Sequence, residues 1–144
     1  MPKTNGTIVS LHIATAHRAP MQHQESARAL ADLGLEGDIH NKAGSKRQVL
    51  LMDEETLSAF GLAAGRVREN ITTRGIALQT LAPGTRLRAG DAVFEITQSC
   101  DPCKMIEDIR PGLRAQMAGQ RGMFVRVVVG GEVRGGDVIE ILNG

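Results

Sequence analysis

The chain has 144 residues, which suits one domain with an apolar core of its own. Its net charge of +1 and its 2% aromatic content exclude both a broad basic surface and a stacking platform for nucleic acid. No apolar run approaches the roughly 20 residues that span a bilayer, and the first residues lack the apolar core of a secretion signal. We therefore expect a single domain over residues 1–144 that is soluble and cytoplasmic, with neither nucleic acid nor membrane as a partner.

In the first part of the chain, Thr7–Ala14 has the composition of a strand and Glu25–Leu33 that of a short helix. The run Arg47–Met52 has the length and composition of a buried strand. Asp53 follows it directly and is a suitable cap for a helix over Glu54–Phe60.

The segment Val67–Thr73 alternates, which predicts a strand with two different faces. One face would carry Arg68, Asn70 and Thr72, three side chains that hydrogen-bond and that could line a shallow polar site. The alternative is a strand surface that simply faces solvent.

In the second part, Ala92–Thr97, Met123–Val129 and Asp137–Leu142 predict strands, and Lys104–Ile109 and Leu113–Ala118 predict short helices. Seventeen glycines are available for the turns between them. This order favours a mainly β fold, a barrel or a compact sandwich, that carries a few short helices. A doubly wound α/β fold would need longer crossover helices than the sequence contains.

The chain has two cysteines, Cys100 and Cys103, in a single C-x-x-C motif. A closed zinc site needs four ligands, and the four histidines lie far upstream without a paired spacing, so zinc is weakly supported. A structural disulfide is disfavoured in a reducing compartment.

The motif follows a predicted strand and precedes a predicted helix, where the helix dipole stabilises a thiolate, at Cys103 above all. A thiolate binds soft metals or attacks sulfur. The alternative is a pair of buried cysteines that act as small apolar residues.

Upstream, Gly37-Asp38 is typical of a turn in which the carboxylate accepts local backbone hydrogen bonds. His40 lies two residues further on and could act as an acid or a base, although a lone histidine is more often structural. Arginine makes up 13 of the 17 basic residues, and guanidinium groups suit phosphates and carboxylates. A small anionic ligand is therefore consistent with the composition, although solvated surface pairs would account for most of these arginines.

Motifs in a fixed order make the chain similar to the MOSC domain family, named for the C-terminal part of molybdenum cofactor sulfurases. They are HIATAHRAPM, GLEGDIH, RQVLL, RENITTRGIAL, LRAGDAVFEIT, CDPC and GMFVRVVVGGEVRGGDVI, and they are spread over nearly the whole length of the sequence. The resemblance implies a MOSC-type β-barrel with a few short helices.

The resemblance also implies residue roles. In family members that carry molybdenum cofactor (molybdopterin), a cysteine in the loop after a strand ligates the metal, and this position matches Cys103. The R-x-N stretch that helps to hold the pterin phosphate matches Arg68 and Asn70, with Thr72 beside them. Arg47, next to Lys46 in the RQVLL motif, would add positive charge. Cys100 occupies a more variable position.

Two activities are associated with the family, namely molybdenum-dependent reduction of N-hydroxylated compounds and carriage of sulfur as a cysteine persulfide. This chain resembles the domain alone, without the N-terminal β-domain or the attached modules of longer members. We therefore expect a partner for cofactor assembly or electron donation in addition to a small-molecule ligand. A thiol–disulfide oxidoreductase is disfavoured because the thioredoxin-like βαβ surroundings are missing. A binding module without catalysis is a further alternative.

Overall fold

The computed structural model describes residues 5–142, and these residues form a mainly β fold. The strands are β1 (Asn5–Ile13), β2 (Gln22–Gln24), β3 (Ser26–Leu30), β4 (Gly34–Leu35), β5 (Val49–Asp53), β6 (Ile71–Arg74), β7 (Arg86–Ala89), β8 (Ala92–Ser99), β9 (Met123–Val129), β10 (Gly131–Arg134) and β11 (Val138–Leu142). The helices are α1 (Glu54–Ala59), α2 (Lys104–Ile109) and α3 (Leu113–Gln116), with a short 3-10 helix η1 (Leu78–Thr80). No helix among the described residues is long and apolar enough to cross a membrane.

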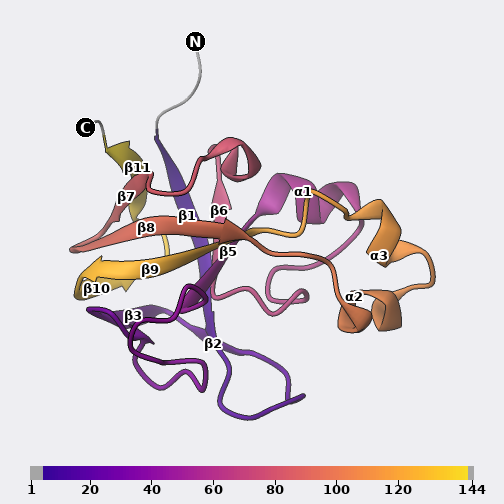
Figure 1. The fold of residues 1–144 in the computed structure, drawn as a ribbon, viewed down its shortest axis with the longest axis horizontal. Helices are drawn as coiled ribbons and strands as arrows, with labels where there is room; N and C mark the ends of the chain where they lie inside the picture. Colours follow the sequence, from indigo (N-terminus) through magenta and orange to yellow (C-terminus); the bar gives the residue numbers. More distant parts are fainter. Residues whose placement is uncertain (1–4, 143–144) are drawn as a thin grey trace.

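The main sheet closes into a barrel (Figure 1). Its strand order is β11-β7-β8-β9-β5-β6-β1-β2, and β1 also pairs with β11, which closes the seven strands from β11 to β1 into the barrel. β5 and β6 are parallel, and the other barrel pairs are antiparallel. The expectation of a barrel is therefore confirmed, and the alternative of a sandwich is wrong.

The barrel interior is filled with aliphatic side chains and one aromatic ring, that of Phe94 on β8. Phe94, Leu51 and Leu87 are completely shielded from solvent. Burial of each such side chain contributes about 1.5–3 kcal/mol, so the barrel interior is the main source of stability.

A second sheet of three strands, in the order β10-β3-β4, includes the segment for which a helix was expected. The prediction of a helix over Glu25–Leu33 is wrong, because Ser26–Leu30 pairs with β10 on one side and with β4 on the other. The alanines, leucines and arginine of this segment have good helix propensity. Backbone hydrogen bonds to two neighbouring strands outweigh that preference, and one of these strands lies a hundred residues away.

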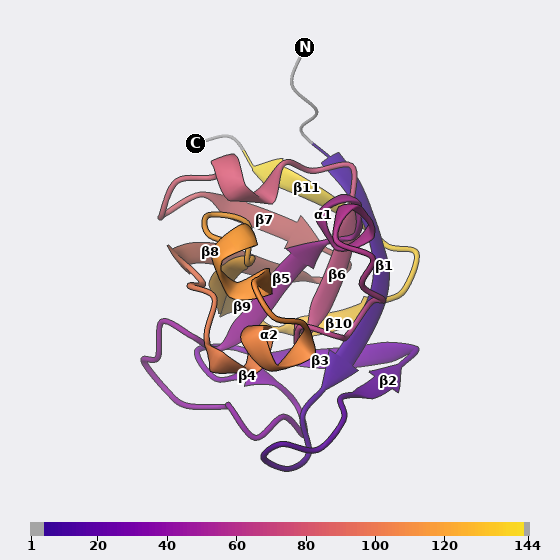
Figure 2. The ribbon, with the colours of Figure 1, turned by 90° about the vertical axis from the view of Figure 1, so that its right-hand side faces the viewer.

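The helices lie together on one side of the barrel, and Figure 2 looks onto α2 and α3 from that side. Helix α1 begins as predicted, since the Asp53 carboxylate accepts a hydrogen bond of 2.9 Å from the Thr56 amide. Helices α2 and α3 cover a second apolar cluster that includes Met52 of β5 and Ile106 of α2. The Glu107 carboxylate accepts hydrogen bonds from the Gly112 and Arg114 amides, which fixes the turn between α2 and α3.

The strand predicted for Val67–Thr73 is only half correct, because β6 begins at Ile71. Residues 64–67 form a turn, in which Gly65 has a φ of +85°. Arg68 has a φ of +63°, which is far from strand geometry. Arg68, Asn70 and Thr72 therefore do not share one strand face, and that part of the expectation is wrong.

Candidate functional site

The two cysteines lie on the loop between β8 and α2, and both are free thiols. The backbone N–H of Cys100 donates to the Gly122 carbonyl at 2.9 Å, so this residue continues the pairing of β8 with β9 and is half-buried. Cys103 is exposed and immediately precedes α2, and its carbonyl accepts from the Ile106 amide of the first helical turn. The loop is held from α3, because Arg114 Nε donates to the Pro102 carbonyl at 3.2 Å.

Burial raises the pKa of the Cys100 thiol, and this effect outweighs the opposing charges of Arg121 and Arg47. The Cys100 thiol is therefore protonated at neutral pH and only partly accessible to solvent, whereas Cys103 is exposed. The sequence-based choice of Cys103 as the reactive thiol agrees with this difference, although its role stays a prediction.

Beside α2 lies a pocket of about 1090 Å³ whose wall is rich in basic side chains. It is bounded by β1 and β2, by the loops that follow β1 and β4, by the turn before β6, and by Met105 of α2. The basic and imidazole groups that line it are His12, His17, Arg18, His23, His40, Arg66 and Arg68. Among the described lining residues there is no carboxylate, so the pocket suits an anionic ligand.

All four histidines of the chain line this pocket, a convergence that their sequence spacing did not predict. The rings of His12 and His23 are 5.9 Å apart. Burial lowers the pKa of His12, and the neighbouring His23 lowers it further. No group of three or more histidine, cysteine, aspartate or glutamate side chains that could hold a metal ion forms within residues 5–142.

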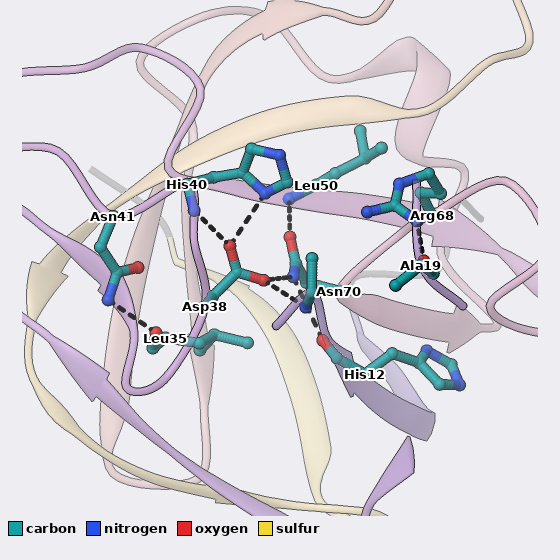
Figure 3. A network of polar contacts seen from close by, with 10 residues as sticks. His12, Ala19, Leu35, Asp38, His40, Asn41, Leu50, Arg68 and Asn70 are labelled. Carbon is teal, nitrogen blue, oxygen red and sulfur yellow. Dashed lines mark hydrogen bonds and ion pairs between the residues drawn. The ribbon is translucent and has the colours of Figure 1, made fainter. Parts of the chain in front are cut away.

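Arg68 enters the pocket from the turn before β6. Its Nη1 donates to the Ala19 carbonyl of the β1–β2 loop, which anchors the guanidinium at one corner (Figure 3). A guanidinium carries five N–H donors, so the others stay available to an anion. Gly65 suits its position nearby, because its φ of +85° is strained for other residues and a Cβ there would lie 3.2 Å from the His12 ring.

Asn70 is buried, and its side-chain amide is fully used inside the protein (Figure 3). Its Oδ1 accepts from the Leu50 amide at 2.9 Å, while its Nδ2 donates to the His12 carbonyl at 3.1 Å and to Asp38 Oδ2 at 2.9 Å. Asn70 therefore holds β1, β5 and the Asp38 loop in register around the pocket.

Asp38 makes contacts beyond the local turn that its sequence context predicts. The local hydrogen bond that is expected of a turn is present, since the His40 amide donates to Asp38 Oδ1 at 2.8 Å. The same carboxylate also accepts from the Ala14 amide at 2.9 Å and from Asn70. These partners lie 24 and 32 positions away in the sequence, so no local pattern signals them.

The remaining predicted site residues lie in two other places. Thr72 is completely buried, and its hydroxyl donates to Glu69 Oε2 at 2.7 Å, so it faces the protein interior. Arg47 does not line the pocket; its guanidinium carbon lies 5.5 Å from the Phe124 ring centre, and its charge acts on Cys100. The pocket thus contains Arg68, while Arg47 belongs to the surroundings of Cys100.

Two charged side chains that the sequence reading did not single out are buried on the same side of the barrel. Glu69 and Arg121 are 0% and 4% exposed. Glu69 Oε1 and two guanidinium nitrogens of Arg121, Nε and Nη1, have no hydrogen-bond partner among the described residues. Burial raises the pKa of Glu69 against the opposing effect of its hydrogen bonds from Gly65 and Thr72.

Solved structures with a similar fold support the barrel, at sequence identities that inform on the fold alone. The YuaD protein from Bacillus subtilis superimposes with a TM-score of 0.80 at 22% identity, over 98% of both chains. YiiM from Geobacillus stearothermophilus gives a TM-score of 0.76 at 18% identity, over 96% of this chain and 75% of that one. YiiM from Escherichia coli gives 0.75 at 21% identity, over 96% and 70%.

A search of curated proteins finds no match to this chain. The family model for the MOSC domain matches residues 38–140, a span that begins at Asp38 and includes Arg68, the cysteine loop and all strands from β5 to β10. This match covers well over half of the sequence, and the chain therefore belongs to the MOSC domain family.

Proposed function

We propose that this chain binds a molybdenum cofactor, with the Cys103 thiolate as a metal ligand, for cofactor handling or for reduction of N-hydroxylated compounds. The observation that carries the proposal is the placement of an exposed thiol at the start of α2, while Met105 of the same helix lines a pocket with Arg66 and Arg68. A soft sulfur ligand and guanidinium groups are the two kinds of donor that a metal-dithiolene pterin phosphate needs.

The residues present fit such a group in part. Arg68 has free donors that face the pocket, so it is suited to a phosphate. Asn70 has no free donor or acceptor, and we assign it the role of holding the pocket wall rather than of contacting phosphate. Thr72 and Arg47 would act at a distance, through Glu69 and through the charge around the cysteine loop.

When bound, the cofactor would supply a redox-active molybdenum centre. The chain itself would supply one sulfur ligand, positive charge for the phosphate and a wall without carboxylates. The structure offers no electron carrier of its own among residues 5–142, and we propose a separate electron-donor or cofactor-assembly protein as partner.

The test is the molybdenum and pterin content of protein purified from a molybdenum-replete host. The wild type and a Cys100→Ser control should contain similar amounts of molybdenum, and Cys103→Ser should contain little. Arg68→Gln should lose pterin about ten-fold or more, because a charged hydrogen bond contributes about 1.5–3 kcal/mol. Arg74→Gln serves as the matched control, since Arg74 pairs with Glu54 on α1 and does not line the pocket. Equal molybdenum in the wild type and in Cys103→Ser would exclude ligation by that thiol.

The second candidate is a sulfur carrier, which the contrast between an exposed Cys103 and a half-buried Cys100 favours. The Cys103 thiolate would attack the outer sulfur of a donor persulfide, so that a Cys103 persulfide forms and the donor leaves as a thiolate. Mass spectrometry after incubation with a persulfide donor should show one added sulfur on Cys103. A free and alkylatable Cys103 after that incubation would exclude the carrier role.

A further inference from the structure

The His40 side chain is anchored on one edge and open on the other. Its Nδ1 lies 2.9 Å from Asp38 Oδ1, and the carboxylate of Asp38 is completely shielded from solvent. The imidazole itself is 48% exposed and lines the pocket. No hydrogen bond to Nε2 forms within residues 5–142, so this nitrogen is free on the open edge of the ring.

The surroundings of Asp38 determine which ring nitrogen carries the proton. Its two oxygens receive hydrogen bonds from the Ala14 amide, the His40 amide and Asn70 Nδ2. Burial by itself raises the pKa of Asp38, but the hydrogen bonds from His40 and Ala14 outweigh burial, and the pKa lies below its ordinary value. An ionised carboxylate can only accept, so the neutral His40 ring must keep its hydrogen on Nδ1.

The two protonation states of His40 therefore differ at Nε2. In the neutral ring Nε2 carries a lone pair, and this lone pair repels the oxygen atoms of an anion. In the protonated ring Nε2–H is a charged donor, while Nδ1–H still donates to Asp38. Protonation at Nε2 thus makes the open edge of the ring attract an anion that it would otherwise repel, and the ring does not have to move.

Other charged or titratable groups line the pocket together with His40. They are three arginines and three histidines, on β1, on β2, on the β1–β2 loop and on the turn before β6. An oxyanion that accepts a hydrogen bond from Nε2–H binds the protonated ring more tightly than the neutral ring, so anion binding and proton uptake favour each other.

We propose that His40, oriented by Asp38, is a proton-linked ligand for a tetrahedral oxyanion group that Arg68 also contacts. The inference rests on the proposed function in one respect, namely that this pocket is the ligand site. It adds a residue and a chemical class, since the oxyanion is either the phosphate of the cofactor or an oxyanionic group of the substrate. Asp38 is a positioning residue in this scheme, because it acts through the imidazole.

The test uses sulfate as the probe, because its charge stays constant between about pH 5.5 and 8.5, where histidines titrate. Sulfate binding to the full chain is measured by calorimetry in two buffers of different ionisation enthalpy, which gives both the affinity and the protons taken up. For the wild type we expect about ten-fold tighter binding at the acidic end, the size of one charge-assisted hydrogen bond, together with net proton uptake.

His40→Gln should lose most of this pH dependence and the proton uptake. His17→Gln is the matched control, since His17 lines the same pocket from the exposed β1–β2 loop and should keep most of both. The proposal is overturned if His40→Gln keeps the pH profile of the wild type, or if His17→Gln loses the profile to the same extent.

Nitrogen-15 spectra of the wild-type imidazole rings test the role of Asp38 without a variant. Neutral His40 should carry its hydrogen on Nδ1, and a hydrogen on Nε2 would overturn the proposal. Repeating the sulfate titration on cofactor-loaded protein identifies the source of the oxyanion, because sulfate should be excluded if the cofactor phosphate occupies the site. If the wild type contains molybdenum but His40→Gln keeps the wild-type pH profile of sulfate binding, this inference fails and the proposed function stands. If sulfate binding is linked to proton uptake but the protein does not take up molybdenum, the proposed function fails and this inference stands.

Discussion

The barrel interior and the side of the barrel that carries the pocket and the cysteine loop differ in the polarity of the side chains that they bury. The interior is apolar, with Phe94 and Leu51 completely shielded from solvent and packed against other aliphatic side chains. The side that carries the pocket and the cysteine loop buries Asp38, Glu69 and Arg121, and some of their polar atoms lack partners among residues 5–142. Buried unpaired polar atoms cost stability. The barrel interior therefore supplies most of the stability of the fold, and the side with the pocket and the cysteine loop supplies less.

Two buried carboxylates show the same contrast on a smaller scale. Asp38 receives hydrogen bonds at both oxygens, and its pKa is lowered even though burial acts in the opposite direction. Glu69 receives hydrogen bonds at Oε2 only, and burial raises its pKa. The number of donors that reach each carboxylate, rather than burial alone, therefore decides the direction of the shift.

The largest expected effect comes from the barrel interior. Phe94→Ala should reduce the free energy of unfolding by about 3–5 kcal/mol, because it leaves a cavity among residues that cannot move to fill it. Denaturant unfolding followed by circular dichroism measures this loss. Arg74→Gln, which breaks an exposed pair with Glu54, should cost less than about 1 kcal/mol. Similar costs for the two variants would contradict the assignment of stability to the barrel.

Asp38→Asn should cost about 1.5–3 kcal/mol at neutral pH, because the variant loses a charged acceptor that several buried donors need. The pKa of Asp38 is lowered on folding, so its contribution to stability is present above about pH 4, the ordinary pKa of aspartate, and is lost as the pH falls through the folded pKa. Unfolding curves at several pH values should show the two proteins converging in acid. A difference that stays constant would mean that Asp38 acts through packing rather than charge.

Cys103 should react about ten-fold or more faster than Cys100 near neutral pH, because burial raises the pKa of the Cys100 thiol and because Cys103 is the more exposed residue. Iodoacetamide labelling followed by peptide mass spectrometry measures the two rates in one sample. Faster labelling of Cys100 would show that the loop opens in solution.

Glu69→Gln should give the smallest change at neutral pH, and it should be stabilising. Folding raises the pKa of Glu69, so the wild type loses stability as the pH rises from the ordinary glutamate pKa through the folded value. The glutamine oxygen can accept from Gly65 and Thr72 as Oε2 does, without the buried charge. The midpoint temperature of thermal unfolding should therefore be higher for the variant than for the wild type at neutral pH. The two midpoints should be equal in acid. A variant that is less stable at neutral pH would show that the fold needs the charge of Glu69, on which the positive charge of Arg121 acts.

Local patterns in the sequence predict the parts of this fold that local forces decide. The strand Met123–Val129 and the helix capped by Asp53 occur where the composition and the cap indicate. The segment after Glu25 forms a strand because its partner β10 is distant in the sequence, which no local propensity reflects. The turn that ends at Arg68 interrupts a convincing alternation, since a positive φ at a residue other than glycine has no sequence signal.

The candidate site was predictable to the extent that its residues form contiguous motifs. The cysteine loop and its helix start were expected from the C-x-x-C motif and from the residues around it. The role of Asp38, the convergence of the histidines and the burial of Arg121 depend on contacts between distant segments. Those contacts exist only once the barrel closes.

X-ray absorption at the molybdenum edge, on wild type and Cys103→Ser purified from a molybdenum-replete host, counts the sulfur atoms around the metal. We expect the molybdenum in the wild type to have one more sulfur ligand than any molybdenum that remains bound to Cys103→Ser. Cys100→Ser should give the same sulfur count as the wild type. The same sulfur count in the wild type and in Cys103→Ser would contradict it.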